Sequence, residues 1–202
     1  MLDNLKKYDI ILASNSPRRR ELLKGLGVDF RAISLPDVDE TYPEQLVGGE
    51  IPAYISKQKS ASYKEFLQDN TLLITADTIV WVGDKQFGKP VDIEDAKCML
   101  KELSGNTHTV YTGVTILTKA LEKTFIAASE VKFATLSDEE IDYYVNTFSP
   151  MDKAGAYGIQ EWIGYIGVES INGSYFNVMG LPIQRLYREL KELWLLTVFT
   201  MT

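Results

Sequence analysis

Hydrophobic runs and the polar positions between them divide the first part of the chain into strands and a helix. The apolar run YDIILA at residues 8–13 predicts a buried strand, and the alternating run FRAISL at residues 30–35 predicts a second strand. Between them a helix is expected to begin at Pro17, because a proline loses nothing at the first helical position. Gly25 and Gly27 suit its C-terminal cap.

The middle of the chain shows the same alternation of patterns. The run LLITADTIVWV at residues 72–82 predicts strand on both sides of a polar centre, and Gly83 and Asp84 then predict a turn. Helices are expected over residues 50–68 and 92–103, the second with an aspartate as its cap.

The remaining elements complete the predicted order. They are a hairpin of two strands at residues 107–118 and 124–135, a helix over 137–147, a glycine-rich region at 155–180 and a last helix over 182–194. Ser137 and Glu140 form the signature of a capping box. Strands and helices alternate early and a hairpin follows, so we expect an α/β fold with a mixed sheet, as a single domain over residues 1–202.

Composition and charge narrow the function. The 202 residues carry a net charge of −7, which argues against a broad nucleic-acid surface. Any phosphate ligand must then be held by a local cluster of cations. A single cysteine rules out an internal disulfide, and neither a signal-peptide core nor a bilayer-spanning run is present, so we expect a cytoplasmic protein.

Three arginines occupy an unusual position. Arg18, Arg19 and Arg20 follow Pro17 in the first turn of the expected helix, where the helix dipole favours acidic residues instead. A bound anion would offset this repulsion, because a helix N-terminus is already an anion site. The alternative is a solvated cationic turn with no ligand.

Asp77 interrupts the apolar run at residues 72–82. An ionised carboxylate there is costly unless it is paired, hydrogen-bonded or bound to a metal. Asp77 is therefore a candidate general base or metal ligand at a cleft, with Asp39 and Glu40 as possible partners. The alternatives are a turn aspartate between two short strands and, for Asp39 and Glu40, solvated loop acids.

Other candidate polar residues are ambiguous taken singly. Lys59 falls in a predicted helix, on a face that also carries Lys57, and exposed lysines are the alternative there. Lys89 in FGKP has a restricted backbone, which suits a fixed cation or an ordinary turn. Gln160 in KAGAYGIQ offers an amide that can donate to and accept from a nucleotide base.

His108 and Cys98 are expected to be structural. His108, the only histidine, follows a helix end and enters a strand, where a hydrogen bond to the backbone is expected. Cys98 lies within a predicted helix and is expected to pack in the core. The glycine-rich phosphate loops, zinc motifs and nucleophile elbow of other enzymes are absent.

Six motifs in order carry a family resemblance. LASNSPRRRELL, ITADTIV, GKP, LSGNTHTVYTGV, DKAGAYGIQ and INGSYFNVMGLP occur between residues 10 and 190. Together they resemble the Maf family of nucleoside triphosphate pyrophosphatases. The resemblance implies an elongated, mixed, twisted β-sheet flanked by helices, with two lobes around a cleft, related to inosine triphosphate pyrophosphatase-like folds.

The resemblance also implies a reaction and its partners. It is hydrolysis of dTTP, UTP and modified pyrimidine nucleotides to the monophosphate and pyrophosphate. The family implies a divalent metal (Mg²⁺, with Mn²⁺ or Co²⁺ as alternatives), a cytoplasmic setting, a homodimer, and no nucleic-acid or membrane partner.

Site residues are implied by position in these motifs. The resemblance assigns Asp77 as catalytic base, Arg18, Thr78 and Gln160 to substrate specificity, Ser14, Arg19, Lys59 and Lys89 to phosphate binding, and Glu40 with Asp77 to the metal. The chain departs from the family pattern at Ser56 and Ser60, where small apolar residues are usual, and at Glu161, where glycine is usual.

Two rival functions stay open at this point. One is a non-catalytic nucleotide-binding regulator of septum formation and cell division, with the same pocket and no turnover. The other is a nucleic-acid-binding module, which the acidic balance of the chain disfavours.

Overall fold

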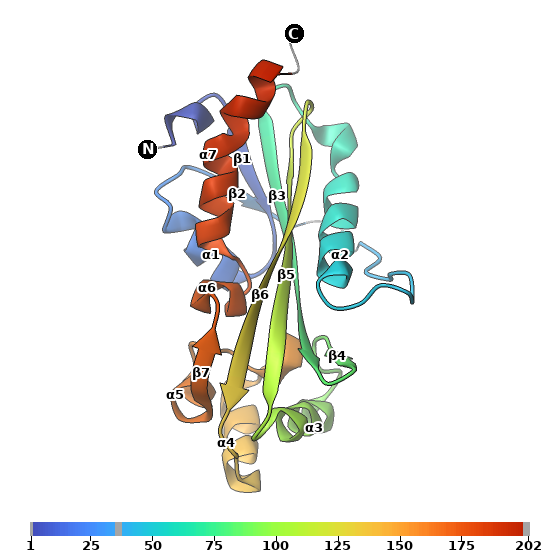
Figure 1. The fold of residues 1–202 in the computed structure, drawn as a ribbon, viewed down its shortest axis with the longest axis vertical. Coiled ribbons are helices and arrows are strands. Elements are labelled where there is room, and N and C mark those ends of the chain that lie inside the picture. The colour runs from blue at the N-terminus through green and yellow to red at the C-terminus, as the bar shows by residue number, and fades with distance from the viewer. Residues whose placement is uncertain (1, 35–37, 200–202) are drawn as a thin grey trace. The chain divides into compact units, whose positions relative to one another are not determined.

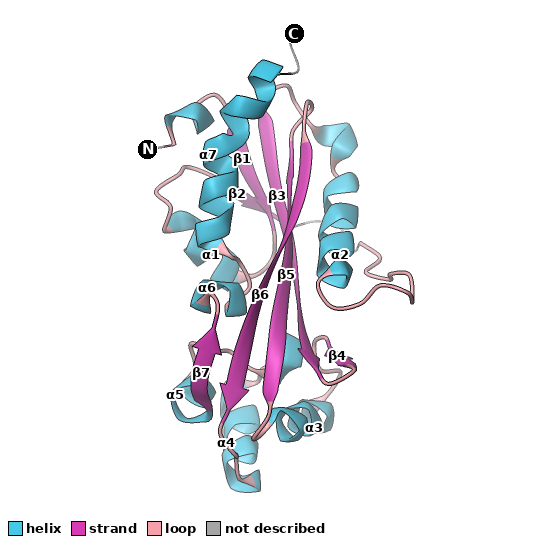
Figure 2. Cartoon of the chain, viewed as in Figure 1, coloured by secondary structure: helices cyan, strands magenta, loops and turns pink. Residues whose placement is uncertain are grey.

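The computed structural model describes residues 2–34 and 38–199 of the chain. Its strands form one mixed seven-stranded sheet in the order β2-β1-β3-β5-β6-β7, with β4 paired to β3 (Figure 2). Strand β1 runs parallel to β2 and β3, whereas β3 with β4 and β6 with β7 are antiparallel. The strands are β1 (Asp9–Ala13), β2 (Arg31–Ile33), β3 (Thr71–Val82), β4 (Lys85–Phe87), β5 (Thr107–Leu117), β6 (Glu122–Phe133) and β7 (Val168–Asn172). The expected α/β class and mixed sheet are confirmed.

The helices follow the strands in the chain as predicted for an α/β protein. They are α1 (Pro17–Lys24), α2 (Glu50–Ala61), α3 (Ile93–Leu103), α4 (Asp138–Phe148), α5 (Trp162–Gly167), α6 (Tyr175–Val178) and α7 (Ile183–Phe199), with 3₁₀ turns η1 (Asp3–Leu5), η2 (Lys64–Phe66) and η3 (Ala154–Ala156). None of the helices in the described ranges is both long and apolar enough to cross a membrane.

The chain divides into two compact units. Unit 1 contains Met1–Asp77, Thr112–Ala127 and Gly180–Thr202, and unit 2 contains Thr78–Tyr111 and Ala128–Met179. Three of the four unit boundaries fall within β3, β5 and β6, and the fourth, at residues 179–180, lies between α6 and α7. One domain over residues 1–202 stays a prediction.

In unit 1, helices α2 and α7 cover opposite faces of the hairpin strands β5 and β6 (Figure 1). The hydroxyls of Thr115 on β5 and Thr124 on β6 lie 2.9 Å apart, and Thr115 also contacts Ser56 of α2. Because side chains alternate along a strand, Phe125 points to the other face. There the guanidinium of Arg185, on α7, lies 5.7 Å from the Phe125 ring centre.

Unit 2 has its own apolar core. It is built from helices α3 and α4 against the sheet, and its fully buried members include Leu100, Leu103, Phe133 and Tyr144. The two helix starts were predicted from their caps. Asp92 accepts from the N–H of Asp95, and Ser137 forms the expected capping box.

Several predicted boundaries are wrong. Strand β3 runs unbroken through Asp77, so the interpretation of Asp77 as a turn residue between two short strands is wrong. Helix α2 ends at Ala61 instead of residue 68, and the last helix continues to Phe199 instead of ending at residue 194. The second strand covers only three of its six predicted residues, of which residue 35 lies outside the described ranges.

Short elements were missed altogether. Strand β4 follows the predicted turn at residues 83–84, and the glycine-rich region contains α5, β7 and α6. These elements have three to six residues, which is too few to show a helical or strand period in the sequence.

Candidate functional site

Three charged side chains meet in unit 1. The ammonium of Lys59, on α2, lies 2.7 Å from Oδ1 of Asp77, on β3, and 2.8 Å from Oε1 of Glu40, in the segment after β2. The side chains of Lys59 and Asp77 are only 14% and 13% exposed, whereas that of Glu40 is 50% exposed. The predicted neighbourhood of Asp77 and Glu40 is confirmed, and the exposed-lysine alternative for Lys59 is wrong.

Lys57 does not share this surface. Its ammonium contacts Glu122 at 3.0 Å and its side chain is 60% exposed. The predicted common face for Lys57 and Lys59 is wrong because residues two apart on a helix point in nearly opposite directions.

The close packing of α2 against the sheet depends on a glycine. A Cβ atom on Gly113 of β5 would lie 2.3 Å from backbone atoms of Pro52 and Ala53, in the first turn of α2. Only glycine permits this approach, and it brings the helix that carries Lys59 onto the strands. Gly113 was not among the residues singled out from the sequence, although a lone glycine inside a strand pattern is a recognised signal of close backbone approach.

Arg19, on α1, is a second cation near Asp77. Ser16 caps α1 as predicted, and its side chain accepts from the backbone N–H of Arg19. The Arg19 guanidinium donates to the carbonyl oxygen of Ala76 at 2.9 Å and to that of Gly180 at 2.8 Å. Burial lowers the pKa of Arg19, and the negative charge of Asp77 opposes that shift. Arg19 and Asp77 thus belong to one charged cluster in unit 1.

Arg20 turns back onto the loop before its own helix. Its guanidinium donates to the carbonyl oxygen of Ser14 at 3.1 Å. The hydroxyl of Ser14, which is buried, accepts from the N–H of Ser16. Two of the three arginines thus donate to backbone carbonyls. These contacts offset part of the positive charge for which the sequence analysis expected a bound anion.

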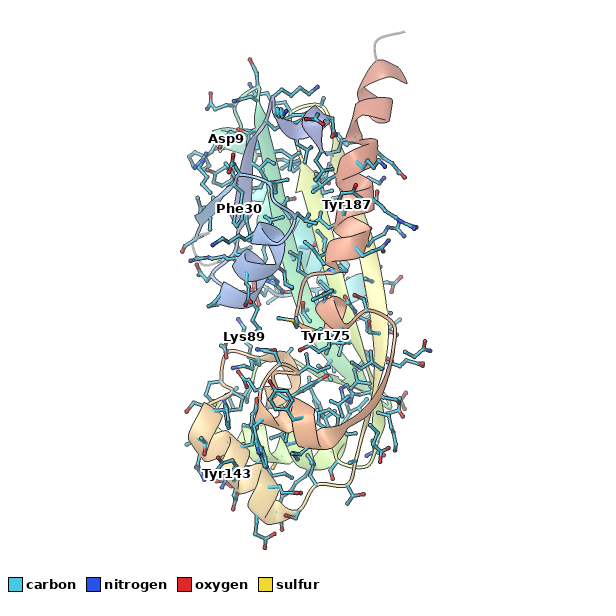
Figure 3. The ribbon with its side chains drawn as sticks, turned by 90° about the vertical axis from the view of Figure 1, so that its left-hand side faces the viewer. Asp9, Phe30, Lys89, Tyr143, Tyr175 and Tyr187 are labelled. Carbon is cyan, nitrogen blue, oxygen red and sulfur yellow. The ribbon has the colours of Figure 1, made fainter. Side chains whose placement is uncertain are left out.

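The remaining predicted residues belong to unit 2. Thr78 follows Asp77 directly on β3, and Lys89 is exposed in the loop after β4 (Figure 3). The N–H of Gly155 donates to the carbonyl oxygen of Gly88, so the Lys89 loop is tied to the segment that leads to Gln160. The Gln160 side-chain oxygen is buried and lacks a hydrogen-bond partner within the described ranges.

Glu161, which follows Gln160 where the family pattern has a glycine, is neutralised within unit 2. Its carboxylate lies 3.2 Å from the ammonium of Lys153 and accepts a hydrogen bond from the hydroxyl of Tyr144. That hydroxyl in turn accepts from the N–H of Gly158 at 2.9 Å. Glu161 therefore links the segment around Gly158 to Lys153 and Tyr144, and its charge is paired. Lys153 and Tyr144 were missed, since their roles depend on contacts across the fold.

His108 is structural, as predicted, but its partner differs. Its Nε2 lies 2.7 Å from the hydroxyl of Tyr157, so a side chain takes the place of the expected backbone group. Burial lowers the pKa of His108 to about 4, and the imidazole is neutral near pH 7. The prediction for Cys98 is wrong, because this thiol is exposed. The buried stripe of α3 holds Leu100 and Leu103, and Cys98 falls on the opposite side.

The carboxylates fit one type of metal site. Within residues 2–34 and 38–199, no group of three or more His, Cys, Asp or Glu side chains is placed to hold an ion. Glu40 and Asp77 are two carboxylates that converge on one ammonium. Such a pair suits Mg²⁺, which is commonly bound by one or two carboxylates together with substrate phosphates and water.

Comparisons with known proteins found relatives that match nearly the whole chain. A protein named dTTP/UTP pyrophosphatase from Bacteroides thetaiotaomicron is 62% identical over 193 residues, covering 96% of this chain and 100% of the relative. One of the same name from Flavobacterium johnsoniae is 46% identical over 191 residues, covering 95% and 98%.

A solved structure and a family model complete the comparison. The structure of a HAM1 protein from Coxiella burnetii aligns with a TM-score of 0.50 at 15% identity, covering 92% of this chain and 99% of that one. It supports the expected fold relationship and nothing beyond the fold. The family model described as Maf-like protein matches residues 9–193. The chain therefore belongs to the Maf family.

Proposed function

We propose that this chain is a nucleoside triphosphate pyrophosphatase that hydrolyses dTTP and UTP to the monophosphate and pyrophosphate. The observation that carries the proposal is the largely buried Asp77 carboxylate, 2.7 Å from Lys59 and one residue from the carbonyl that Arg19 binds. An acid flanked by two cations suits attack of water on a polyphosphate. The relatives named dTTP/UTP pyrophosphatase at 46–62% identity support the same reaction.

Asp77 acts as general base. It takes a proton from a water molecule whose oxygen forms a new bond to phosphorus, while the bridging P–O bond breaks and pyrophosphate leaves with its electrons. Phosphoryl chemistry of this kind depends mainly on positioning and on stabilising negative charge. Lys59 and Arg19 supply positive charge beside Asp77, and Ser14 and Lys89 complete the proposed set of phosphate-binding residues.

A divalent cation is the proposed cofactor. Glu40 and Asp77 would hold it, with Mg²⁺ favoured over Mn²⁺ or Co²⁺ by an all-oxygen ligand set. When bound, the ion supplies charge neutralisation on phosphate oxygens. Lys59 already neutralises the same carboxylates, so it keeps the two acids together before any ion arrives.

Selection of the nucleotide base is the role that we propose for Arg18, Thr78 and Gln160. A glutamine amide can donate to O4 of uracil or thymine and accept from N3–H of the same edge. The buried side-chain oxygen of Gln160, which lacks a partner within the described ranges, is consistent with an acceptor reserved for a ligand. Pyrimidines modified elsewhere on the ring present the same edge and are expected to be substrates too.

A turnover panel tests the proposal. Pyrophosphate and monophosphate are measured from dTTP, UTP, their modified forms and the purine triphosphates, with Mg²⁺. We expect release of pyrophosphate, with dTTP and UTP preferred. Tight nucleotide binding without product would instead support the non-catalytic regulator, and release of single phosphates would contradict the proposed bond cleavage. A cytoplasmic setting and a homodimer also stay predictions.

A further inference from the structure

Helix α2 and strand β3 are joined by a second polar contact next to the ion pair. Thr75, fully buried on β3, donates a hydrogen bond of 2.7 Å from its hydroxyl to the main-chain carbonyl of Ser56 on α2. Two residues further along the strand lies Asp77, and three residues further along the helix lies Lys59. Thr75 with Ser56 and Asp77 with Lys59 are therefore two contacts between the same helix and the same strand.

Helix α2 and strand β3 run in opposite directions (Figure 1), and this direction decides how the two contacts are related. Residues two apart on a strand share a face and lie about 6.6 Å apart along it. Residues three apart on a helix also share a face and rise about 4.5 Å. Because the two elements run in opposite directions, these steps lead apart, and the long side chain of Lys59, which tilts toward the helix N-terminus, closes the distance to Asp77. Fixing the carbonyl of Ser56 against Thr75 therefore sets the place on α2 from which the ammonium of Lys59 reaches the carboxylate.

The two buried serines of α2 have hydrogen-bond partners. The hydroxyl of Ser56 lies 3.0 Å from that of Thr115 on β5 and donates to the carbonyl of Ala53 at 2.9 Å. The hydroxyl of Ser60 donates to the carbonyl of Lys57. The two serines that depart from the family pattern are thus buried with partners, and Ser56 takes part in docking the helix.

We propose that Thr75 is a positioning residue for the Lys59–Asp77 pair. Its hydroxyl holds α2 in register with β3, so that the ammonium reaches the carboxylate. A buried valine would fill nearly the same space without making this bond, so the hydroxyl is what fixes the register. The inference rests on the proposed function, because it matters to catalysis only if Asp77 acts there.

Kinetics of three variants test the role. Thr75→Val removes the hydroxyl, Thr75→Ser keeps it, and Thr71→Val is the matched control. Thr71 is equally buried on β3, but its hydroxyl accepts from the N–H of Gln68, away from α2. We expect Thr75→Val to lower kcat about tenfold with KM changed less than about twofold, since sub-ångström misplacement of catalytic groups acts on the chemical step. Thr75→Ser restores kcat.

The control separates positioning from stability. Thr71→Val is expected to lower the melting temperature about as much as Thr75→Val while keeping kcat. Should Thr75→Val fail to fold, Thr75→Ala also lacks the hydroxyl and cannot crowd the core. Unchanged kcat in the variant without the hydroxyl, an equal loss in Thr71→Val, or no recovery in Thr75→Ser would each overturn the inference.

A second readout needs no substrate. In the ligand-free protein labelled with ¹⁵N, the Lys59 ammonium, held by two carboxylates, is expected to exchange slowly and give a side-chain NMR signal that Lys59→Met removes. The signal is expected to vanish in Thr75→Val and to persist in Thr75→Ser and Thr71→Val. Persistence in Thr75→Val overturns the inference. If the wild type releases no pyrophosphate, the proposed function fails, whereas this signal still decides whether Thr75 positions Lys59.

Discussion

The ammonium of Lys59 donates a hydrogen bond of 2.7 Å to the carboxylate of Asp77, and both side chains are largely removed from solvent. Each charge makes the burial of the other tolerable. Removing one partner of such a pair costs more than the pair itself contributes, because it leaves an uncompensated charge. The pair is therefore sensitive to single substitutions at either end.

Lys59→Met is expected to lower the free energy of unfolding by about 3 kcal/mol, since it leaves Asp77 and Glu40 facing each other with Arg19 as the remaining counter-charge. Turnover is expected to fall at least about 100-fold. Lys57→Met is the matched control, because Lys57 forms an exposed pair worth about 1 kcal/mol or less. Denaturant unfolding and pyrophosphate release measure both effects. Equal costs for the two variants would contradict the account.

Glu40→Gln is expected to change the metal dependence more than the stability. Half of the Glu40 side chain is exposed, so the loss of its charge changes the free energy of unfolding by about 1 kcal/mol or less. If Glu40 binds the cation, the Mg²⁺ concentration for half-maximal turnover rises at least about tenfold, the loss caused even by residues that only support a ligand. A Mg²⁺ titration with unchanged midpoint would remove Glu40 from the metal site.

The buried imidazole of His108 predicts a pH dependence of stability. Its pKa is lowered to about 4 in the folded chain from about 6.5 when unfolded. Between these values the unfolded chain binds a proton that the folded chain does not, so the free energy of unfolding falls as the pH falls. Over the whole window this group removes about 3 kcal/mol.

Comparison with a variant that does not titrate isolates this effect. His108→Gln can still form a hydrogen bond with the hydroxyl of Tyr157, and its free energy of unfolding is expected to fall less between pH 6.5 and about 4. Denaturant titrations at a series of pH values measure both slopes. Parallel curves for the two proteins would show that His108 is protonated in the fold.

Gly113→Ala is expected to displace α2. The new Cβ would lie 2.3 Å from the backbone of Pro52 and Ala53, which must move away at a cost of about 1–3 kcal/mol. Gly88→Ala is the stability control, because a Cβ there meets open space. A melting temperature lowered equally by both substitutions would argue against a close helix–strand contact at Gly113.

Local signals in the sequence predicted much of the fold. Ser16 and Ser137 cap the helices that follow them, and the hairpin strands β5 and β6 lie where the apolar runs predict. These features depend on a few neighbouring residues. The alternative of a turn at Asp77 was wrong because the charge is neutralised by Lys59, which comes from another element.

The site itself was less accessible to sequence reasoning. Asp77 could be singled out because a charge in an apolar run demands a partner, but the resemblance to a family, not the pattern, supplied Lys59. Whether a helical lysine is exposed depends on which face the sheet covers, and α2 is held by Gly113 and Thr75 through contacts far apart in the sequence. Thr75 did carry a signal, because it shares a strand face with Asp77.

The central claim is that Asp77 is the base of a pyrophosphate-releasing hydrolase. The most direct test measures pyrophosphate release from dTTP with Mg²⁺ by the wild type and by Asp77→Asn, together with nucleotide affinity at equilibrium. We expect the wild type to release pyrophosphate and the variant to lose about 100-fold or more of kcat while binding dTTP with similar affinity. Full turnover by Asp77→Asn, or none by the wild type, would contradict the account.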